Sequence, residues 1–251
     1  MPKRISLARK AKKMGNLNKA LIIHGWTYSL EKYKKIAEVL ILKGLQTDIL
    51  KVPGLTEKID KPWNLDDYID WLKNRIDKEK GKVVLIGHSN GGRIAGAYAS
   101  LYPQKLAYLV LIDSAGISHD EFHVKLRLLF FTTLAKIGKK IGSSAILKNL
   151  LYKLTGESDY NNATADMKKT MTNLVKSDLS FSLNKINTPT LIIWGELDKV
   201  TPLSDGKIMH KFIKNSKLYI VKGAKHAPHF THTEEVAEII SRSILAQGYS
   251  L

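Results

Sequence analysis

The sequence predicts an α/β fold built on a doubly wound, mostly parallel sheet of about six strands. Short apolar runs rich in β-branched residues alternate along the chain with longer segments whose apolar residues recur at helical spacing. Strands that alternate with helices in this way pair in parallel, and the helices cover both faces of the sheet. The chain has 251 residues, of which 44% are hydrophobic, enough to bury the core of one domain.

Glycine and proline separate the expected elements. Gly44 follows the first helical stripe, Gly81 follows the second, and Pro103 stops the third. The last helix carries Glu234 and Glu235 in its first turn, where the helix dipole favours acids. The expected order is strand 19–23, helix 30–42, strand 47–52, helix 65–77, strand 83–86, a helix up to about 102, strand 106–112, strand 189–194, helix 204–213, strand 217–221 and helix 233–246.

The alternation is interrupted after the strand that ends at Asp113. Residues 117–180 show no strand pattern and are expected to form two or three helices, the first with lysines on one side and apolar residues on the other. We interpret this segment as a helical cap that roofs a pocket, in preference to a helix lying on a membrane. The candidate pocket residues in it are Phe130, Phe131 and Leu134.

The predicted domains are a basic N-terminal tail over 1–18, a core made of 19–116 and 181–251, and the cap over 117–180. Residues 1–19 hold seven basic side chains and no acidic one, and no long apolar run follows them, so they do not resemble a secretory signal. Weak contact of the tail or the cap with an anionic membrane surface is compatible with this charge.

The formal net charge of +17 comes mostly from lysines spread along the chain. No nucleic-acid-binding motif accompanies them, so we interpret them as a solvated surface and expect no nucleic-acid partner. The chain has no cysteine, which excludes thiol chemistry and gives no sign of an oxidising compartment. We expect a cytoplasmic location, and the sequence does not indicate the oligomeric state.

The segment 82–99 carries the strongest functional signal. A buried strand leads into Gly87-His88-Ser89-Asn90-Gly91-Gly92 and then into a small-residue helix, which is the context that a G-x-S-x-G pattern requires. Such a turn forces its central residue into a strained backbone conformation and projects the side chain above the sheet. The flanking glycines are needed because a Cβ there would collide with the neighbouring strand or helix. Ser89 is therefore the candidate nucleophile, and Gly87, His88 and Gly91 form its elbow.

A serine nucleophile requires a histidine base, and the histidine requires a carboxylate. Of the eight histidines, His226 follows the last strand in a loop that can reach over the sheet edge, whereas His229 and His232 are expected at the surface or in loop packing. Asp198 follows the strand 189–194. Asp113 also ends a strand and is a rival acid. Its alternative role is to accept the backbone amides of Ser114 and Ala115 where the chain enters the cap.

Four motifs in order resemble the α/β-hydrolase superfamily, in its single-domain branch with a helical cap. They are His24-Gly25-Trp26, the 87–92 elbow, Trp194-Gly195-Glu196-Leu197-Asp198 and His226-Ala227-Pro228. The resemblance covers residues 19–246. It implies that Ser89 is the nucleophile, Asp198 the orienting acid and His226 the base, with an oxyanion hole made by the backbone amides of Trp26 and Asn90. The ring of Trp26 is also a candidate for the acyl pocket.

The chain departs from this family at its start, where the tail leaves no room for the usual antiparallel hairpin. We therefore expect the shortened sheet of six strands. No phosphate-binding glycine loop and no metal-binding pattern are present, so no cofactor or metal is expected.

The serine at the elbow argues against dehalogenases and epoxide hydrolases, which need a carboxylate there. The favoured function is hydrolysis of a small-molecule carboxylic ester of short-to-medium acyl chain length. A carbon–carbon bond hydrolase or a lactonase of the same fold is the alternative. A non-catalytic ligand-binding module is a more distant one, because binding alone would not require serine, aspartate and histidine together.

Overall fold

The computed structural model describes residues 19–27, 29–118 and 164–249. These residues form a six-stranded sheet in the order β2-β1-β3-β4-β5-β6, and every neighbouring pair is parallel. The strands are β1 (Ala20–Ile23), β2 (Thr47–Ile49), β3 (Val83–His88), β4 (Leu106–Ile112), β5 (Thr190–Gly195) and β6 (Ser216–Val221). The central strands β3, β4 and β5 are buried along their whole length, as expected of a sheet covered on both faces.

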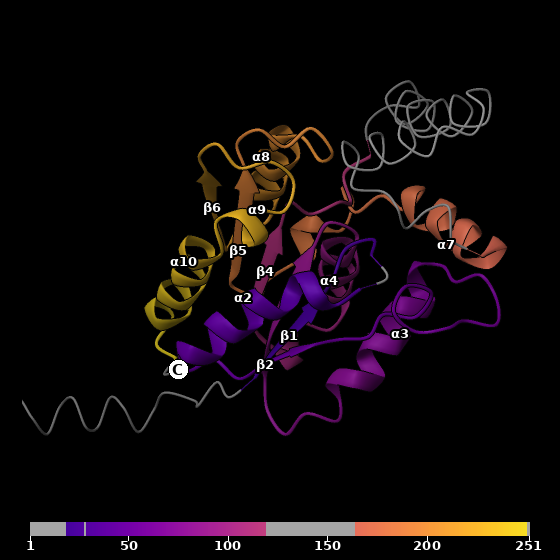
Figure 1. Ribbon diagram of the computed structural model, residues 1–251, viewed down its shortest axis with the longest axis horizontal. Coiled ribbons are helices and arrows are strands. Elements are labelled where there is room, and N and C mark those ends of the chain that lie inside the picture. Colours follow the sequence, from indigo (N-terminus) through magenta and orange to yellow (C-terminus); the bar gives the residue numbers. More distant parts are fainter. Residues whose placement is uncertain (1–18, 28, 119–163, 250–251) are drawn as a thin grey trace, which may run out of the picture.

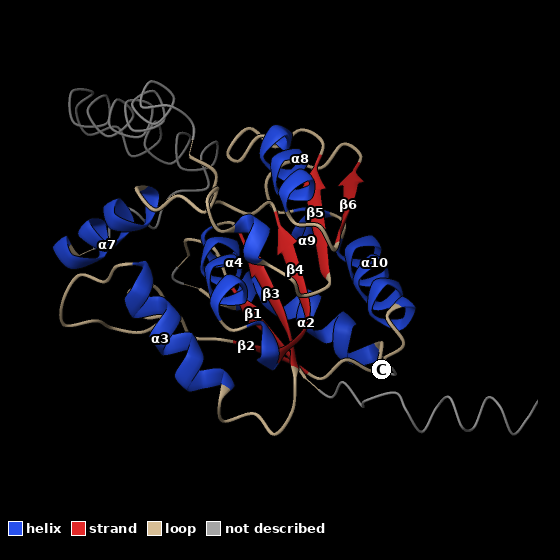
Figure 2. Cartoon of the chain, turned by 180° about the vertical axis from the view of Figure 1, so that it is seen from behind, coloured by secondary structure: helices blue, strands red, loops and turns tan. Residues whose placement is uncertain are grey.

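Helices cover both faces of this sheet (Figures 1 and 2). One face packs against α3 (Leu65–Ile76), α4 (Asn90–Leu101) and α8 (Leu203–Phe212), through a core that includes Tyr68, Tyr98 and Met209. The other face packs against α2 (Glu31–Leu42) and α10 (Thr233–Ala246), through Leu40 and Ile240. Removing this apolar surface from water contributes roughly 25 cal/mol per Å². The predicted doubly wound sheet of six strands is confirmed.

The element boundaries agree with the sequence prediction to within a few residues. The largest difference is β2, which ends at Ile49 instead of 52, because the chain turns into a loop that pairs Pro53 with Glu57. One short helix, α9 (Pro228–Thr231), lies where the sequence predicts a loop. The described elements also include two short 3-10 helices, η1 (Pro103–Lys105) and η3 (Leu183–Lys185).

Part of the predicted cap is described. Helix α7 (Ala165–Val175) is capped at its N-terminus by Thr164, whose hydroxyl accepts the amide of Met167. It is anchored to the core because Arg93 of α4 donates to the carbonyl of Leu174 and Thr170 accepts the amide of Trp63. Residues 119–163, including Phe130, Phe131 and Leu134, lie outside the described residues, as does the tail over 1–18.

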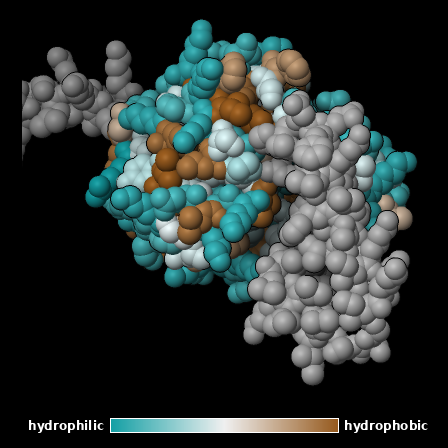
Figure 3. All heavy atoms as spheres, turned by 90° about the horizontal axis from the view of Figure 1, so that it is seen from above, coloured by the Kyte–Doolittle hydropathy of each residue, from teal (hydrophilic) through white to brown (hydrophobic). Residues whose placement is uncertain are grey.

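The parallel strands end at one edge of the molecule, which is the upper edge in Figure 1. His24, Ser89, Asp113, Asp198 and His226 follow β1, β3, β4, β5 and β6 at this edge, as the sequence predicts. Seen from above, apolar residues gather in the middle of this face (Figure 3). Among the described helices, none has the length and apolar character that crossing a membrane requires.

Candidate active site

Ser89 occupies a strained turn between β3 and α4. Its φ of 53° and ψ of −119° lie in a region that residues other than glycine rarely adopt. The turn is tight: a Cβ on Gly87 would lie 2.6 Å from the carbonyl oxygen of Gly91, and one on Gly91 would lie 2.1 Å from that of Ile23. The two glycines therefore allow the elbow to form, as the sequence predicts.

Asp198 and His226 form a direct hydrogen bond. His226 Nδ1 lies 2.8 Å from Asp198 Oδ2, so the ring donates from Nδ1 and its Nε2 is left for another partner. The other carboxylate oxygen of Asp198 accepts the amides of Val200 at 2.7 Å and Thr201 at 3.1 Å. Burial would raise the pKa of Asp198, but the hydrogen bond and charge of His226 outweigh it, and the pKa lies below its usual value.

Asp113 is hydrogen-bonded to both of the loops that carry Asp198 and His226. It is fully buried, with one carboxylate oxygen accepting the amide of Gly195 at 2.8 Å and the other that of Ala227 at 2.7 Å. Its nearer oxygen is 4.0 Å from His226 Nδ1, beyond hydrogen-bond distance. Burial, and secondly the charge of Asp198, raise the pKa of Asp113 to about 7.

The expected alternative role of Asp113 is wrong. Its carboxylate does not cap the amides of Ser114 and Ala115, because the amide of Ala115 donates instead to the carbonyl of Ser89. The backbone of Asp113 also has a positive φ of 41°, which turns its side chain toward the loops after β5 and β6. Asp113 therefore ties the Asp198 loop to the His226 loop.

Three further histidines are buried around Tyr33, beneath the loops of this edge. Rings of His24, His88 and His229 have centroids 5.8, 6.0 and 5.2 Å from that of Tyr33. Burial lowers the pKa of His24 to about 4 and that of His229 to about 3, and it lowers the pKa of His88 well below its usual value. All three rings are therefore uncharged at neutral pH.

The free energy of unfolding is expected to fall as the pH is lowered from about 6.5 to about 4. The unfolded chain protonates these histidines near pH 6.5, whereas the folded chain takes up the same protons only at lower pH. Each histidine contributes a slope of about 1.4 kcal/mol per pH unit in that window. Asp113 has the opposite sign, because its raised pKa makes the folded chain bind a proton first, so it offsets roughly the contribution of one histidine.

Urea unfolding at pH 7, 6 and 5 measures this slope. His229→Leu removes two buried ring nitrogens for which the described residues offer no hydrogen-bond partner, and it should lower the slope by roughly the contribution of one histidine. Equal unfolding free energies at pH 7 and pH 5 would contradict the assignment of uncharged histidines.

The oxyanion candidates lie on either side of the elbow. Asn90 is the first residue of α4, where backbone amides have no partner within the helix. Trp26 lies in the loop after β1 and is partly buried, packing against the core that includes α3 and α4. Its neighbour Gly25 approaches the elbow so closely that an added Cβ would lie 3.1 Å from the Cβ of Ser89.

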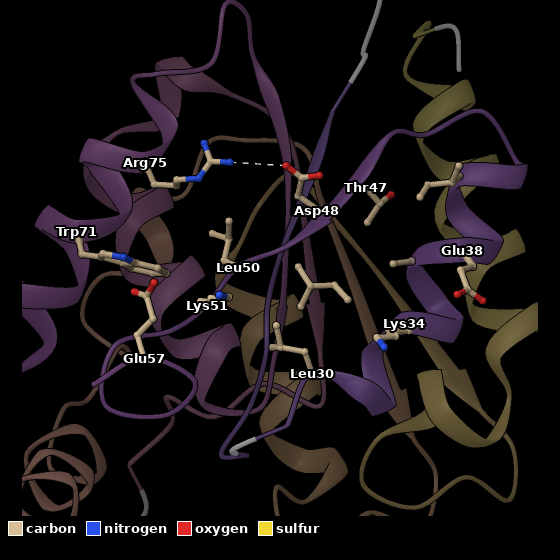
Figure 4. A pocket seen from close by; sticks show the side chains of 13 residues that line it. Leu30, Lys34, Glu38, Thr47, Asp48, Leu50, Lys51, Glu57, Trp71 and Arg75 are labelled. Atoms are coloured by element: carbon tan, nitrogen blue, oxygen red, sulfur yellow. Dashed lines mark ion pairs between the residues drawn. The ribbon is translucent and has the colours of Figure 1, made fainter. Parts of the chain in front are cut away.

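Among the described residues, His88, Asp113 and His226 are a set whose ligand atoms could meet at a metal ion, lying within 4.8 Å of one another. Hydrogen bonds within the protein account for most of these atoms, since Asp113 accepts two amides and His226 pairs with Asp198. A surface pocket of about 570 Å³ lies elsewhere, between α2, β2 and α3, where Leu50, Trp71 and Arg75 line it (Figure 4). Ser89, Asp198 and His226 do not line this pocket.

The sequence prediction missed two residues of this site. Thr201 donates its hydroxyl to Asp198 at 2.7 Å and lies 3.4 Å from His226 Nδ1, yet in the sequence it is one polar residue of a loop. Tyr33 belongs to the apolar stripe of the first helix, so the sequence indicates a core residue and gives no sign of its hydroxyl contacts. His229 was expected in surface or loop packing, and it is buried with 1% of its surface exposed.

The sequence and the fold are similar to those of known proteins. The chain is 30% identical over 180 residues to the uncharacterized hydrolase YugF of Bacillus subtilis strain 168, a match that spans 65% of this chain and 64% of that protein. It is 25% identical over 228 residues to a pimeloyl-[acyl-carrier protein] methyl ester esterase of Legionella pneumophila strain Corby, spanning 85% of this chain and 90% of the relative.

The fold matches an α/β hydrolase enzyme from the metagenome of sediments from the lagoon of Mar Chica, Morocco. The TM-score is 0.70 at 20% identity, and the match covers 94% of each chain. The family model described as serine aminopeptidase, S33, matches residues 18–233, which include the elbow, the Asp198 loop and the His226 loop. The chain therefore belongs to this S33 family of α/β hydrolases.

Proposed function

We propose that the protein hydrolyses carboxylic esters of short-to-medium acyl chain length through an acyl-enzyme on Ser89. The observation that carries this proposal is the hydrogen bond from His226 Nδ1 to Asp198, at the sheet edge where Ser89 projects from its elbow. A neutral imidazole that carries its proton on Nδ1 presents the lone pair of Nε2, and such a lone pair is what a serine hydroxyl needs as its base. The esterase named among the relatives supports an ester as the substrate class.

The reaction follows from these groups. His226 Nε2 takes the proton of Ser89 while Oγ attacks the ester carbonyl carbon, and the backbone amides of Trp26 and Asn90 stabilise the resulting oxyanion. The tetrahedral intermediate expels the alcohol, which leaves with the proton held by His226, and the acyl group stays on Ser89. Water then attacks the acyl-enzyme by the same steps and releases the carboxylic acid. Asp198 holds the tautomer of His226 and stabilises its charged form throughout.

The surface at this edge supports an apolar substrate. Leu197 and Val200, on the loop that carries Asp198, are 51% and 47% exposed. Apolar residues gather on the face toward which the strands point (Figure 3). Such a surface favours an acyl chain over a charged group, because burying apolar atoms removes them from water.

Hydrolysis of p-nitrophenyl acetate, butyrate, octanoate and palmitate at pH 7–8 tests the proposal. We expect turnover of the shorter chains and a decline toward palmitate, and the optimum measures the length of the acyl pocket. Turnover of prolyl p-nitroanilide without turnover of any ester would contradict the proposal and favour a peptidase. Turnover of lactones, or hydrolysis of a carbon–carbon bond in a ring-cleavage product, without turnover of any ester would also contradict the proposal.

A further inference from the structure

The hydroxyl of Tyr33 joins the two loops that the proposed mechanism uses. Tyr33 lies in the first turn of α2, with 2% of its surface exposed. Its oxygen accepts the backbone amide of Gly25 at 2.9 Å and lies 2.7 Å from Nδ1 of His88. Gly25 immediately precedes Trp26 on the oxyanion loop, and His88 immediately precedes Ser89 on the elbow. One oxygen atom therefore connects the two loops.

The donors and acceptors of this contact agree with one another. The amide of Gly25 can only donate, so the Tyr33 oxygen accepts it, and the single proton of the hydroxyl is available for His88. Burial raises the pKa of Tyr33, so the hydroxyl keeps this proton. His88 is uncharged and accepts at Nδ1, which places its own ring proton on Nε2.

Neighbouring rings hold Tyr33 in place. Phe230 meets it edge to face with centroids 4.9 Å apart, and His229 lies 5.2 Å away. The loop that Tyr33 holds packs closely against the elbow, because a Cβ on Gly25 would lie 3.0 Å from His88 Nδ1 and 3.1 Å from the Cβ of Ser89. A shift of Gly25 would therefore change the distance between the Trp26 amide and Ser89.

We propose that Tyr33 is a positioning residue that fixes the oxyanion loop relative to the nucleophile elbow. It acts by holding Gly25, and through Gly25 the amide of Trp26. This inference rests on the proposed function, since it assigns Trp26 the role of oxyanion donor. A misplacement of about 1 Å costs roughly 100-fold in rate when it separates reacting groups, which sets the size of the effect expected.

Tyr33→Phe keeps the ring and removes only the hydroxyl. We expect kcat for p-nitrophenyl butyrate to fall roughly 10- to 100-fold with little change in KM, because the oxyanion forms after substrate binds. Tyr68→Phe is the matched control. Tyr68 is equally buried and donates its hydroxyl to the carbonyl of Pro53 at 2.7 Å, and Pro53 belongs to neither of the two loops. Tyr68→Phe should lose about as much thermal stability as Tyr33→Phe while its kcat stays near that of the wild type. An equal loss of kcat in both variants would overturn the proposal.

Hydrogen exchange of the Gly25 amide gives a second measurement that needs no substrate. The Gly25 amide should exchange at least about tenfold faster in Tyr33→Phe than in the wild type or in Tyr68→Phe, because its acceptor is gone. Unchanged exchange would overturn the contact, and faster exchange with unchanged kcat would overturn the positioning role. Loss of the proposed function itself gives a different pattern: the wild type is then inert on every ester, and the positioning role of Tyr33 falls with it.

Discussion

Ser89→Ala is expected to lower kcat on short-chain p-nitrophenyl esters by at least about 10³-fold, and by up to about 10⁶-fold. Alanine has no oxygen to attack the carbonyl or to carry the acyl group, so only binding and the oxyanion amides remain. The folded state should be retained. Both serine and alanine are disfavoured at the φ of 53° that the elbow imposes, so the substitution adds little strain.

Ser100→Ala is the matched control for this loss. Ser100 lies on the same helix as the elbow, and its hydroxyl donates to the carbonyl of Ala97 within that helix at 2.8 Å. This variant should keep kcat near that of the wild type. If Ser89→Ala retained more than about a tenth of the wild-type kcat, Ser89 would not be the nucleophile.

Asp198→Asn is expected to lower kcat by about 10⁴-fold. The asparagine oxygen can keep the amides of Val200 and Thr201, so the loop should fold as before. Its NH₂ group then faces His226 Nδ1 and donates to it, which moves the ring proton to Nε2. A histidine protonated at Nε2 cannot take the proton of Ser89, and the loss therefore appears in kcat.

Glu196→Gln separates this effect from a general change of the loop. Glu196 is exposed on the same loop and accepts the amide of Gly223 at 2.8 Å, a contact that does not reach His226. We expect nearly unchanged kcat for this variant. Equal losses in Asp198→Asn and Glu196→Gln, or full activity in Asp198→Asn, would show that Asp198 does not orient His226.

The fold could be predicted because its signals are local. Apolar β-branched runs such as 106–112 identify buried strands, and the helical stripe of 233–246 defines a helix whose observed bounds are the predicted ones. The alternation then fixes the topology, since parallel strands place their carboxyl ends at one edge. That is why Ser89, Asp198 and His226 could be expected together before any contact was known.

Contacts between distant segments could not be predicted in the same way. Asp113 and Asp198 both end strands in the sequence, and only the distances of 4.0 and 2.8 Å to His226 distinguish them. The hydroxyl of Tyr33 is bonded to residues 8 and 55 positions away, and periodicity reports only that its ring faces the core. The short helix α9 was missed because four residues are too few to show a helical period.

The central claim, an acyl-enzyme on Ser89, is tested most directly by rapid mixing of the protein with p-nitrophenyl acetate. We expect a burst of p-nitrophenol of about one equivalent per chain, followed by slower steady turnover. Intact-mass measurement of the acid-quenched sample should show one added acetyl group, located on the peptide that contains Ser89 and missing from Ser89→Ala. Steady turnover with no acetylated protein, or acetylation at another residue at the same rate, would contradict the account.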